Sequence, residues 1–283
     1  MTCILCNFDS YHILYEKENF HVVRCDSCGL VYVHPQPSQD RIRRLYNETY
    51  YNAWGLKDNL ESVERIKKQT CHKRFEEIEK YMPPGKILDN GCATGLSLEV
   101  ASVRSWEPYG VELSEYSSNI AKKKFGKAVF TGTLEEANFQ SNFFNAILML
   151  DLIEHVPNPN RTLSEARRIL RHDGLLALTT PDITSLSSRV MRKHWVNIKF
   201  EHLFYFSPRT IASILEKNHF RVLKIIPAVK ALNLTYFHTQ FNVYKMPLVT
   251  EAINVVVYII PKLLKQMCFY ASVGDMFVIA RKN

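Results

Sequence analysis

An apolar strand that runs through a glycine turn directly into a helix is the feature that most constrains this chain. The stretch Lys86–Gly95 carries it, with Gly91 and Gly95 at the turn. Small residues there let a ligand approach the backbone closely, and the N-terminus of the following helix supplies unpaired N–H groups. The sequence therefore predicts a nucleotide-type ligand site at the start of an α/β domain.

The spacing of this turn separates it from a dinucleotide site. A dinucleotide-binding turn needs the spacing G-x-G-x-x-G, whereas Gly91 and Gly95 are four residues apart and Asp89 precedes the first by two. A carboxylate beside the turn would repel a pyrophosphate, but it suits a ligand with a cationic amino-acid end and no phosphate. S-adenosylmethionine is such a ligand. A generic strand–turn–helix of another α/β protein is the alternative.

A second acid supports the nucleoside interpretation. Glu112 ends the next predicted strand, about 20 residues beyond the turn, where a carboxylate can accept hydrogen bonds from both ribose hydroxyls. Taken alone, Glu112 is equally compatible with an exposed glutamate at a strand end. Beside the first motif, the ribose role is favoured.

Predicted strands and helices alternate after Gly85. The strands cover 86–90, 108–112, 128–130, 144–150, 174–180, 220–226 and 275–280. The helices cover 94–104, 115–125, 159–170 and 207–218, the last with Ser207 as its N-cap, and a helical insertion covers roughly 246–270. Strands that alternate with helices of this length form a parallel, doubly wound sheet.

Over roughly Lys86–Ile226 the chain resembles the class I S-adenosylmethionine-dependent methyltransferases. The resemblance rests on the turn, on Glu112, and on later motifs that follow in the family's order, among them Phe143–Ile147, Arg168–Gly174 and Thr179–Asp182. It implies an α/β, Rossmann-like, doubly wound and mostly parallel seven-stranded sheet whose last strand is antiparallel. It also implies methyl transfer from S-adenosylmethionine.

The resemblance assigns the cofactor to four places along the chain. The residues are Asp89, Gly91, Cys92 and Gly95 at the turn, Glu112 and Leu113 after the second strand, Thr133 and Leu134 in the adenine-facing loop, and Asp151 after the fourth strand.

Three positions depart from the family pattern. Ala93 replaces the middle glycine of the turn, so we expect the turn to avoid a conformation that only glycine reaches. Thr133 and Leu134 stand where an acid often binds the adenine amino group, and Asn145 replaces a frequent aspartate. None of the three removes a reacting group.

Four cysteines near the N-terminus form two Cys-x-x-Cys pairs. They are Cys3 and Cys6, then Cys25 and Cys28, with a predicted hairpin between the pairs. This spacing provides four thiolates for one tetrahedral zinc ion. Because four ligands close the coordination shell, we expect a structural zinc. Four free structural cysteines or a redox pair are the alternatives.

A second resemblance concerns this N-terminal module. The run Cys25–Ser38, followed by Tyr50 and Tyr51, is similar to the module of bacterial methyltransferases that modify sugars and glycans, including sugar C-methyltransferases. Those C-methyltransferases usually carry a further large C-terminal domain, which does not follow here, so an O- or N-methyl acceptor is favoured. The resemblance implies a small hydroxyl or amino acceptor, namely a sugar, a nucleotide-linked sugar or a glycan precursor.

Two histidines are the candidate catalytic bases. His155 ends the run Asp151-x-x-Glu154-His155, which resembles the Glu-x-x-Glu-His of ubiquinone-pathway O-methyltransferases, where such groups can bind a divalent cation. A divalent cation at Asp151, Glu154 and His155 is therefore a further expectation. His202 lies in a segment, Trp195–Phe206, whose aromatic residues suit a sugar ring. A structural role for either histidine stays open.

The motifs divide the chain into three parts. We expect a zinc knuckle over 1–37, a helical linker or lid over 38–82, and the methyltransferase domain over 83–283, with acceptor insertions near 183–206 and 233–273. In the lid, aromatic side chains are expected to cover a ligand, although ordinary packing would explain them equally: Tyr46, Tyr50, Tyr51 and Trp54.

Composition limits the class of protein. The net charge of +8 permits anionic partners, but the densest cluster, Lys122–Lys124, is explained by a solvated helix end. The most apolar stretch, Ile253–Leu264, is broken by Pro261 and is shorter than the ~20 residues of a spanning helix. With no signal-peptide pattern at Met1–Ser10, we expect a soluble, cytoplasmic protein without a membrane span.

Two other functions stay open at this point. An RNA methyltransferase would suit the zinc module and the positive charge, but a Lys/Arg stripe with interleaved aromatics is missing, so a nucleic-acid partner is not expected. A non-catalytic scaffold on the same fold is disfavoured by the intact cofactor residues, among them Asp89 and Glu112. The sequence leaves the oligomeric state open.

Overall fold

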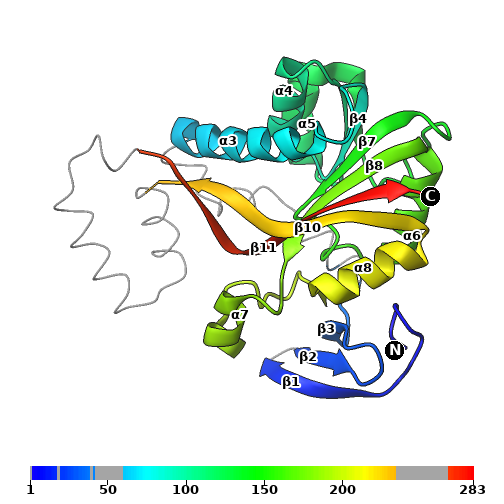
Figure 1. Ribbon diagram of the computed structural model, residues 1–283, viewed down its shortest axis with the longest axis vertical. Helices are drawn as coiled ribbons and strands as arrows, with labels where there is room; N and C mark the ends of the chain where they lie inside the picture. The colour runs from blue at the N-terminus through cyan, green and yellow to red at the C-terminus, as the bar shows by residue number, and fades with distance from the viewer. Residues whose placement is uncertain (1, 18–19, 39–40, 42–59, 234–266) are drawn as a thin grey trace.

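The computed structural model describes residues 2–17, 20–38, 41, 60–233 and 267–283, and these form two β-sheets (Figure 1). The larger sheet has seven strands in the order β10-β11-β8-β7-β4-β5-β6. Its strands are β4 (Lys86–Asn90), β5 (Glu107–Glu112), β6 (Val129–Thr131), β7 (Phe144–Leu150), β8 (Leu170–Pro181), β10 (Phe220–Leu232) and β11 (Phe269–Lys282).

The pairing within this sheet is mostly parallel. Adjacent strands from β6 across to β8 run parallel, whereas β11 is antiparallel to both of its neighbours, β8 and β10. The expected α/β, Rossmann-like fold with an antiparallel last strand is therefore confirmed.

Helices cover both faces of the central sheet. One face carries α3 (Leu60–Ile78), α4 (Leu96–Val103) and α5 (Glu115–Phe125); the other carries α6 (Pro159–Ile169) and α8 (Pro208–Lys217) (Figure 1). Three short helices lie in connections: η2 (Gly126–Ala128), α7 (Leu186–Met191) and η3 (Arg192–His194).

The apolar side chains of strand β8 pack against the helices on both faces of the sheet. Leu176 and Leu178 of β8 pack in the cluster that includes α6 and α8, while Leu175 and Ala177 pack in the cluster that includes α3 and α4. Successive side chains of a strand point to opposite faces, and a strand covered on both faces is apolar throughout. This two-sided burial explains the apolar runs that identified the strands.

Helix starts follow local chemistry. The expected N-cap Ser207 accepts a hydrogen bond from the amide of Thr210 and forms a capping box with it, and Pro208 occupies the first turn. Helix α4 begins at Leu96 rather than at Thr94, because Gly95 has a left-handed backbone with φ of 85°.

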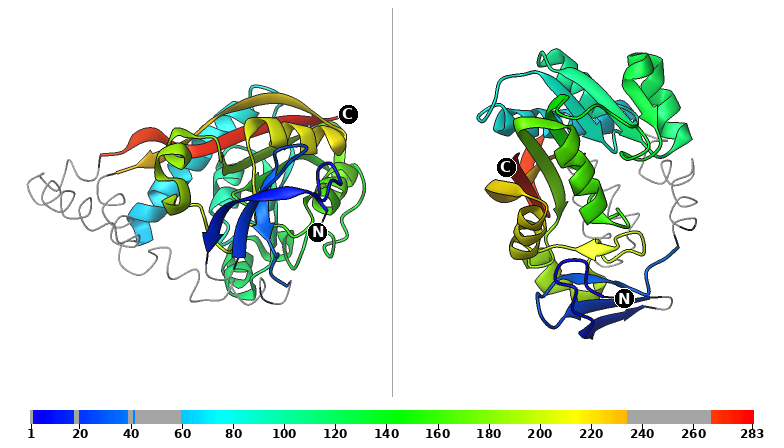
Figure 2. Two further views of the ribbon diagram at one scale, coloured as in Figure 1. Left: turned by 90° about the horizontal axis from the view of Figure 1, so that it is seen from below. Right: turned by 90° about the vertical axis from the view of Figure 1, so that its right-hand side faces the viewer.

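The smaller sheet joins the N-terminal strands to a strand of the acceptor segment. It contains β1 (Tyr11–Lys17), β2 (Phe20–Cys25), β3 (Val31–His34) and β9 (Phe204–Tyr205), all antiparallel. The hairpin of β1 and β2 was expected, but the addition of β9 from the acceptor segment was not. Figure 2 shows β9 lying beside the N-terminal strands. The N-terminal module is thus built into the main fold.

Packing confirms that connection. Cys3, Cys25 and Leu30 of the N-terminal module belong to the same apolar cluster as Leu203 and Phe206 of the acceptor segment. A separate knuckle would bury its apolar side chains among themselves. Loss of order at the N-terminus is therefore expected to reach the acceptor segment as well.

The end of the chain differs from the expectation. Strand β11 begins at Phe269 rather than at Asp275, so Phe269 and Tyr270 are strand residues and not part of the predicted helical insertion, and residues 246–266 of that insertion lie outside the described residues. The lid residues of the predicted N-terminal helix also lie outside them: Tyr46, Tyr50, Tyr51 and Trp54. Among the residues that the structure describes, no helix combines the length and apolar character of a membrane-spanning segment.

Candidate active site

The candidate site lies where the winding of the central sheet reverses. Strands β4 and β7 are neighbours, and the chain proceeds from β4 to β5 and β6 on one side and from β7 to β8 on the other. Ligands of open α/β sheets bind beyond the carboxyl ends of the strands at such a point. Asp89 near the end of β4, Glu112 at the end of β5 and Asp151 directly after β7 share this edge.

The glycine turn after β4 is fixed by hydrogen bonds to β5. The amides of Gly91 and Cys92 donate to the carbonyl of Val111 at 2.8 and 3.1 Å. Gly91 has φ of 89°, and a Cβ there would lie 3.2 Å from a methyl carbon of Leu152. The left-handed backbone therefore favours glycine at position 91, and a side chain there would also have to displace the methyl group of Leu152 slightly.

The middle position of the turn keeps a left-handed residue. Ala93 has φ of 47°, so this conformation is retained rather than avoided. An L-residue reaches it at a cost of roughly 1–2 kcal/mol. The amide of Ala93 donates to Glu112 Oε2 at 2.9 Å, which ties the turn to the end of β5.

Asp89 presents an unpaired oxygen beside the turn. The hydroxyl of Ser97 donates to Oδ2, while the buried Oδ1 has no hydrogen-bond partner. Burial raises the pKa of Asp89 to about 6. A buried carboxylate oxygen without a donor fits a ligand that brings an ammonium group, as the amino-acid end of S-adenosylmethionine does.

Glu112 is fixed by the backbone. Its Oε2 accepts from Ala93 and its Oε1 accepts from the amide of Ser114 at 2.8 Å, and only 5% of the residue is exposed. Each carboxylate oxygen has a second lone pair, which suits the expected ribose hydroxyls. Leu113 follows, half-buried.

The expected adenine loop follows β6. Leu134 is buried in the main apolar cluster, and the amide of Thr133 donates to Glu136 Oε2 at 2.8 Å. An acid therefore does stand in this loop, at Glu136, which the family spacing does not identify because it lies two residues beyond the expected pair Thr133 and Leu134. Cys92 is also placed differently, since its sulfur is buried against β5, and a Cβ at Gly110 would lie 2.6 Å from it.

Asp151 lies among cations after β7. Its amide and Oδ1 are held by the hydroxyl of Thr179 at 2.9 and 2.6 Å, and its Oδ2 is 3.9 Å from both Arg74 and Lys230. Burial alone would raise the pKa of Asp151, but Lys230 and Arg74 outweigh it and hold the pKa below its usual value. The side chain is still 44% exposed, so it is charged and accessible.

The two histidines predicted as bases meet in the structure. The amides of Leu203 and Phe204 donate to the carbonyl of Glu154 at 2.8 and 3.2 Å, which joins the loop after β7 to the acceptor segment. The rings of His155 and His202 then lie edge to face, with centroids 4.6 Å apart.

Both histidines are neutral. His155 Nδ1 lies 3.0 Å from the carbonyl oxygen of Glu201, which can only accept, so the proton is on Nδ1 and Nε2 carries the lone pair. Burial lowers the pKa of His155 to about 4 and also holds that of His202 well below its usual value. Neutral imidazoles can accept a proton or ligate a metal.

Glu154 completes this group and changes the expected cation site. Ligand atoms of Glu154, His155 and His202 lie within 4.8 Å of one another. The set expected from sequence contained Asp151 in place of His202; in the structure Thr179, Arg74 and Lys230 surround Asp151, and His202 is the third residue of the group. Glu154 Oε2 and His202 Nδ1 are buried without hydrogen-bond partners, as empty ligand atoms would be.

Four of the five Phe, Tyr and Trp residues of the acceptor segment are placed differently from the expectation, while the fifth, Phe200, is half-buried with its ring 5.6 Å from that of Phe20. Trp195, Phe204, Tyr205 and Phe206 are all 2% exposed or less. Trp195 and Tyr205 pack against β2 and β3, because β9 pairs with β3. These rings are part of the core and do not present a stacking face for a sugar.

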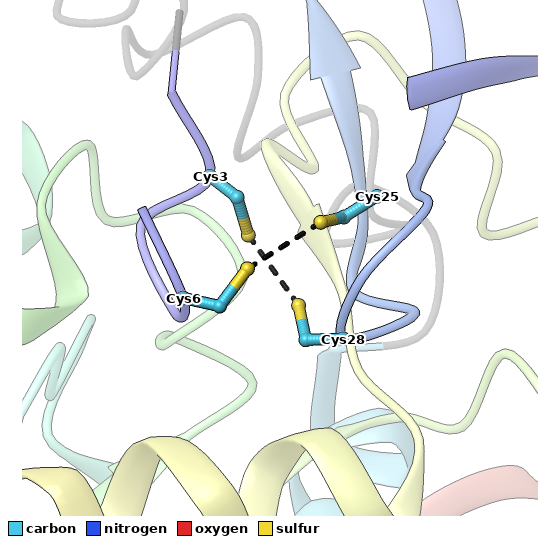
Figure 3. Close-up of side chains that lie close together, drawn as sticks. All are labelled: Cys3, Cys6, Cys25 and Cys28. Atoms are coloured by element: carbon cyan, nitrogen blue, oxygen red, sulfur yellow. Dashed lines mark hydrogen bonds between the residues drawn. The ribbon is translucent and has the colours of Figure 1, made fainter. Parts of the chain in front are cut away.

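The four N-terminal cysteines converge on one point (Figure 3). The sulfurs of Cys3 and Cys28, and those of Cys6 and Cys25, are each 3.5 Å apart, and all four are free thiols. A disulfide would place two sulfurs about 2 Å apart, whereas ligands of a tetrahedral zinc with bonds of about 2.3 Å lie about 3.8 Å apart. The sulfur positions therefore fit a metal ion and not two disulfides.

Comparison with known proteins matches this site to one family. The profile of the methyltransferase domain matches residues 63–225. A ubiquinone biosynthesis O-methyltransferase from Dechloromonas aromatica is 32% identical over 101 residues, which cover 34% of this chain and 44% of that protein. The (+)-O-methylkolavelool synthase of Herpetosiphon aurantiacus is 25% identical over 177 residues, which cover 59% and 62%.

A solved structure shares the fold. It is an S-adenosylmethionine-dependent methyltransferase from Thermotoga maritima, described as a possible histamine N-methyltransferase, with a TM-score of 0.56 and 22% identity. The likeness covers 87% of this chain and 100% of that one.

Proposed function

This chain belongs to the methyltransferase-domain family and is an S-adenosylmethionine-dependent methyltransferase, and we propose that it methylates a hydroxyl or amino group of a small molecule. The observation that carries the proposal is the neutral pair His155 and His202 beside Glu154, beyond the strand ends. Oxygen acceptors need a base or a cation that exposes a lone pair, and this group can supply either.

The cofactor residues are assigned by their chemistry. Asp89 would accept from the ammonium of S-adenosylmethionine and Glu112 from its ribose hydroxyls, while Gly91 and Gly95 allow the close approach. When bound, the cofactor supplies an electrophilic methyl group on a sulfonium. The protein contributes orientation and exclusion of water, which carry much of the catalysis in such a displacement.

The remaining assignments follow the edge of the sheet. Leu113 would border the ribose, and Thr133 and Leu134 would border the adenine. Glu136 would be an additional hydrogen-bond acceptor for the adenine amino group. Asp151 would face the methyl-bearing end of the cofactor, since it follows β7 at the switch point. Cys92 would support the turn from beneath through its buried side chain.

The acceptor is proposed to be methylated on oxygen, with nitrogen as the second choice. The names of two similar proteins, the ubiquinone biosynthesis O-methyltransferase and the (+)-O-methylkolavelool synthase, support a small organic acceptor and an O-methyl product. A sugar or nucleotide-linked sugar is the finer proposal. Its support is the resemblance of the cysteine module, because the buried aromatic residues of the acceptor segment give none.

A zinc ion is proposed for the cysteine cluster, and its role would be structural. Strand β3 of the module pairs with β9, and β9 directly follows His202 and Leu203. Zinc would therefore stabilise the segment that places His202 next to His155. The free thiols fit a reducing compartment, and the cytoplasmic location stays a prediction.

Replacement of Glu112 tests the cofactor assignment. Glu112→Ala should weaken the binding of S-adenosylhomocysteine by roughly 1–3 kcal/mol, the cost of losing hydrogen bonds to a charged group. Isothermal calorimetry measures it. Glu115→Ala, which removes an exposed acid in the first turn of α5, is the matched control and should bind as the wild type does. Unchanged affinity in Glu112→Ala would show the ribose assignment to be wrong.

Metal analysis tests the zinc proposal. Protein purified without added metal should contain one zinc per chain, and Cys6→Ser should lose it while Cys268→Ser, outside the cluster, retains it. Small zinc modules draw much of their folding energy from the metal. Cys6→Ser should therefore lower turnover through β9 and leave cofactor affinity nearly intact. A reduced wild-type sample without metal, or full turnover after zinc loss, contradicts this role.

Single substitutions test the acceptor chemistry. At the true base, His155→Ala or His202→Ala should lower kcat by about 10²–10⁴ with unchanged cofactor affinity. The exposed His172→Ala is the control. Nucleotide sugars, quinol-type phenols and RNA are offered as acceptors. Full turnover in both histidine variants would show that neither histidine is the catalytic base. Methylation of RNA but of no small molecule would contradict the proposed small-molecule acceptor.

Glu154→Gln separates a base from a cation. Burial raises the pKa of Glu154 well above its usual value, which favours the protonated acid when no metal is bound, and Gln closely resembles that form. A mechanism with a histidine base should tolerate this substitution. A mechanism that holds a divalent cation at Glu154, His155 and His202 should lose activity, because the only negative ligand of the three is removed.

A further inference from the structure

We propose that Lys67 and Arg74 of α3 and Lys230 of β10 form an anion site beside Asp151 that receives a carboxylate or phosphate group of a bound small molecule. The inference rests on the proposed function, since the two sources of such a group are the amino-acid end of the cofactor and the acceptor. None of the three cations was singled out by sequence motifs.

Arg74 is a buried arginine whose donors are not all paired. The residue is 9% exposed, and its Nε is buried without a hydrogen-bond partner. Among the described residues Asp151 is the one acid that forms an ion pair with it, with Nη2 and Oδ2 3.9 Å apart, which is too long for a hydrogen bond. A guanidinium has five N–H donors, and buried polar groups are normally satisfied. Arg74 therefore lacks an acceptor that a ligand would supply.

Helix α3 is fixed in the position that brings the cations together. Thr70 Oγ1 accepts a hydrogen bond from the amide of Ala231 at 2.9 Å, which pins α3 against β10 (Figure 1). Lys67 and Arg74 are seven residues apart and so share a face of α3 with Thr70 between them. Lys230 directly precedes Ala231. The three cations thus flank one anchored contact.

The ion pairs of this group leave some of its donors unpaired. Lys230 Nζ is 2.5 Å from Asp275 and 3.9 Å from Asp151, so it is shared by the only two acids that the structure pairs with these cations in the described residues. Lys67 makes no ion pair with a described residue, and burial lowers its pKa. Glu64 and Asp89 act electrostatically on Lys67 and Arg74, but among the described residues only Asp151 and Asp275 form ion pairs with the three cations. The Lys67 ammonium and the buried Arg74 Nε are therefore left for an anionic ligand to pair with.

Both sources of the anion are compatible with the position. Arg74 acts electrostatically on Asp89 as well as on Asp151. Since the cofactor carries its ammonium and carboxylate on one carbon, the unpaired Asp89 Oδ1 and the unpaired Arg74 Nε are complementary to that pair. Lys67 of α3 and Lys230 of β10 are close enough to act on each other electrostatically, and an anionic group of the acceptor would bind between them. Two oxygens of either group fit the planar fork of Arg74.

Calorimetry on the full chain distinguishes the two sources. The probes are S-adenosylhomocysteine, its analogue without the carboxylate, and inorganic diphosphate added with or without saturating S-adenosylhomocysteine. The variants are Arg74→Gln, Arg74→Lys and Lys67→Gln. Lys73→Gln is the matched control, because Lys73 is an exposed neighbour on α3 that pairs with Glu76.

If the cofactor supplies the anion, Arg74→Gln weakens the binding of S-adenosylhomocysteine by a factor between about ten and a hundred. This is the range for a charge-assisted hydrogen bond. The analogue without the carboxylate then binds equally to wild type and variant. If the acceptor supplies the anion, diphosphate binds the cofactor-saturated protein. Arg74→Gln and Lys67→Gln then each lower the affinity for diphosphate at least about tenfold, for the same reason. Arg74→Lys retains part of the affinity in either case.

The proposal is overturned if wild-type protein binds no diphosphate and Arg74→Gln leaves S-adenosylhomocysteine affinity unchanged. It is also overturned if Lys73→Gln weakens binding as much as Arg74→Gln, because net charge alone would then explain the effect. Thermal melting without ligand checks folding: removal of an unsatisfied buried cation should not lower Tm, whereas loss of a structural arginine should. Failure of the wild type to bind S-adenosylhomocysteine refutes the proposed function separately, while diphosphate binding still tests the site.

Discussion

The carbonyl of Glu154 organises the acceptor side of this protein. It accepts hydrogen bonds from the amides of Leu203 and Phe204. These bonds join the loop after β7 to a segment almost fifty residues later in the chain. His202 then meets His155, and β9 continues into a pairing with β3. The candidate catalytic group and the N-terminal sheet are therefore connected through the acceptor segment, to which the contact of His155 Nδ1 with the Glu201 carbonyl and the bond from the Val33 amide to the Leu203 carbonyl also contribute. A change in the cysteine module has a direct structural path to the proposed bases.

Much of the cofactor half was readable from local sequence. The strand, the glycine turn and Glu112 are consecutive along the chain, and parallel strands bring their carboxyl ends to one edge, so Asp89 and Glu112 follow from spacing. The N-cap Ser207 and the antiparallel last strand were predictable for the same reason, since local patterns and the family's topology determine them.

The remainder depends on pairings that leave no local signal. The two-residue strand β9 forms because β3 offers an edge, and its pairing buries the aromatic residues that looked suited to a sugar. His202 joins Glu154 and His155 in place of Asp151 because long-range hydrogen bonds bring it there. Arg74 and Lys230 resemble ordinary surface cations in the sequence; only the anchoring of α3 on β10 places both beside Asp151.

The central claim is that one edge of the sheet holds the cofactor and presents its methyl group to the histidine pair. A crystal structure of the protein with S-adenosylhomocysteine tests it most directly. The account predicts the ribose hydroxyls on Glu112, the ammonium on Asp89, and the sulfur on the side of the site that His155 and His202 face. A nucleoside bound elsewhere, or a sulfur turned away from both histidines, would contradict it.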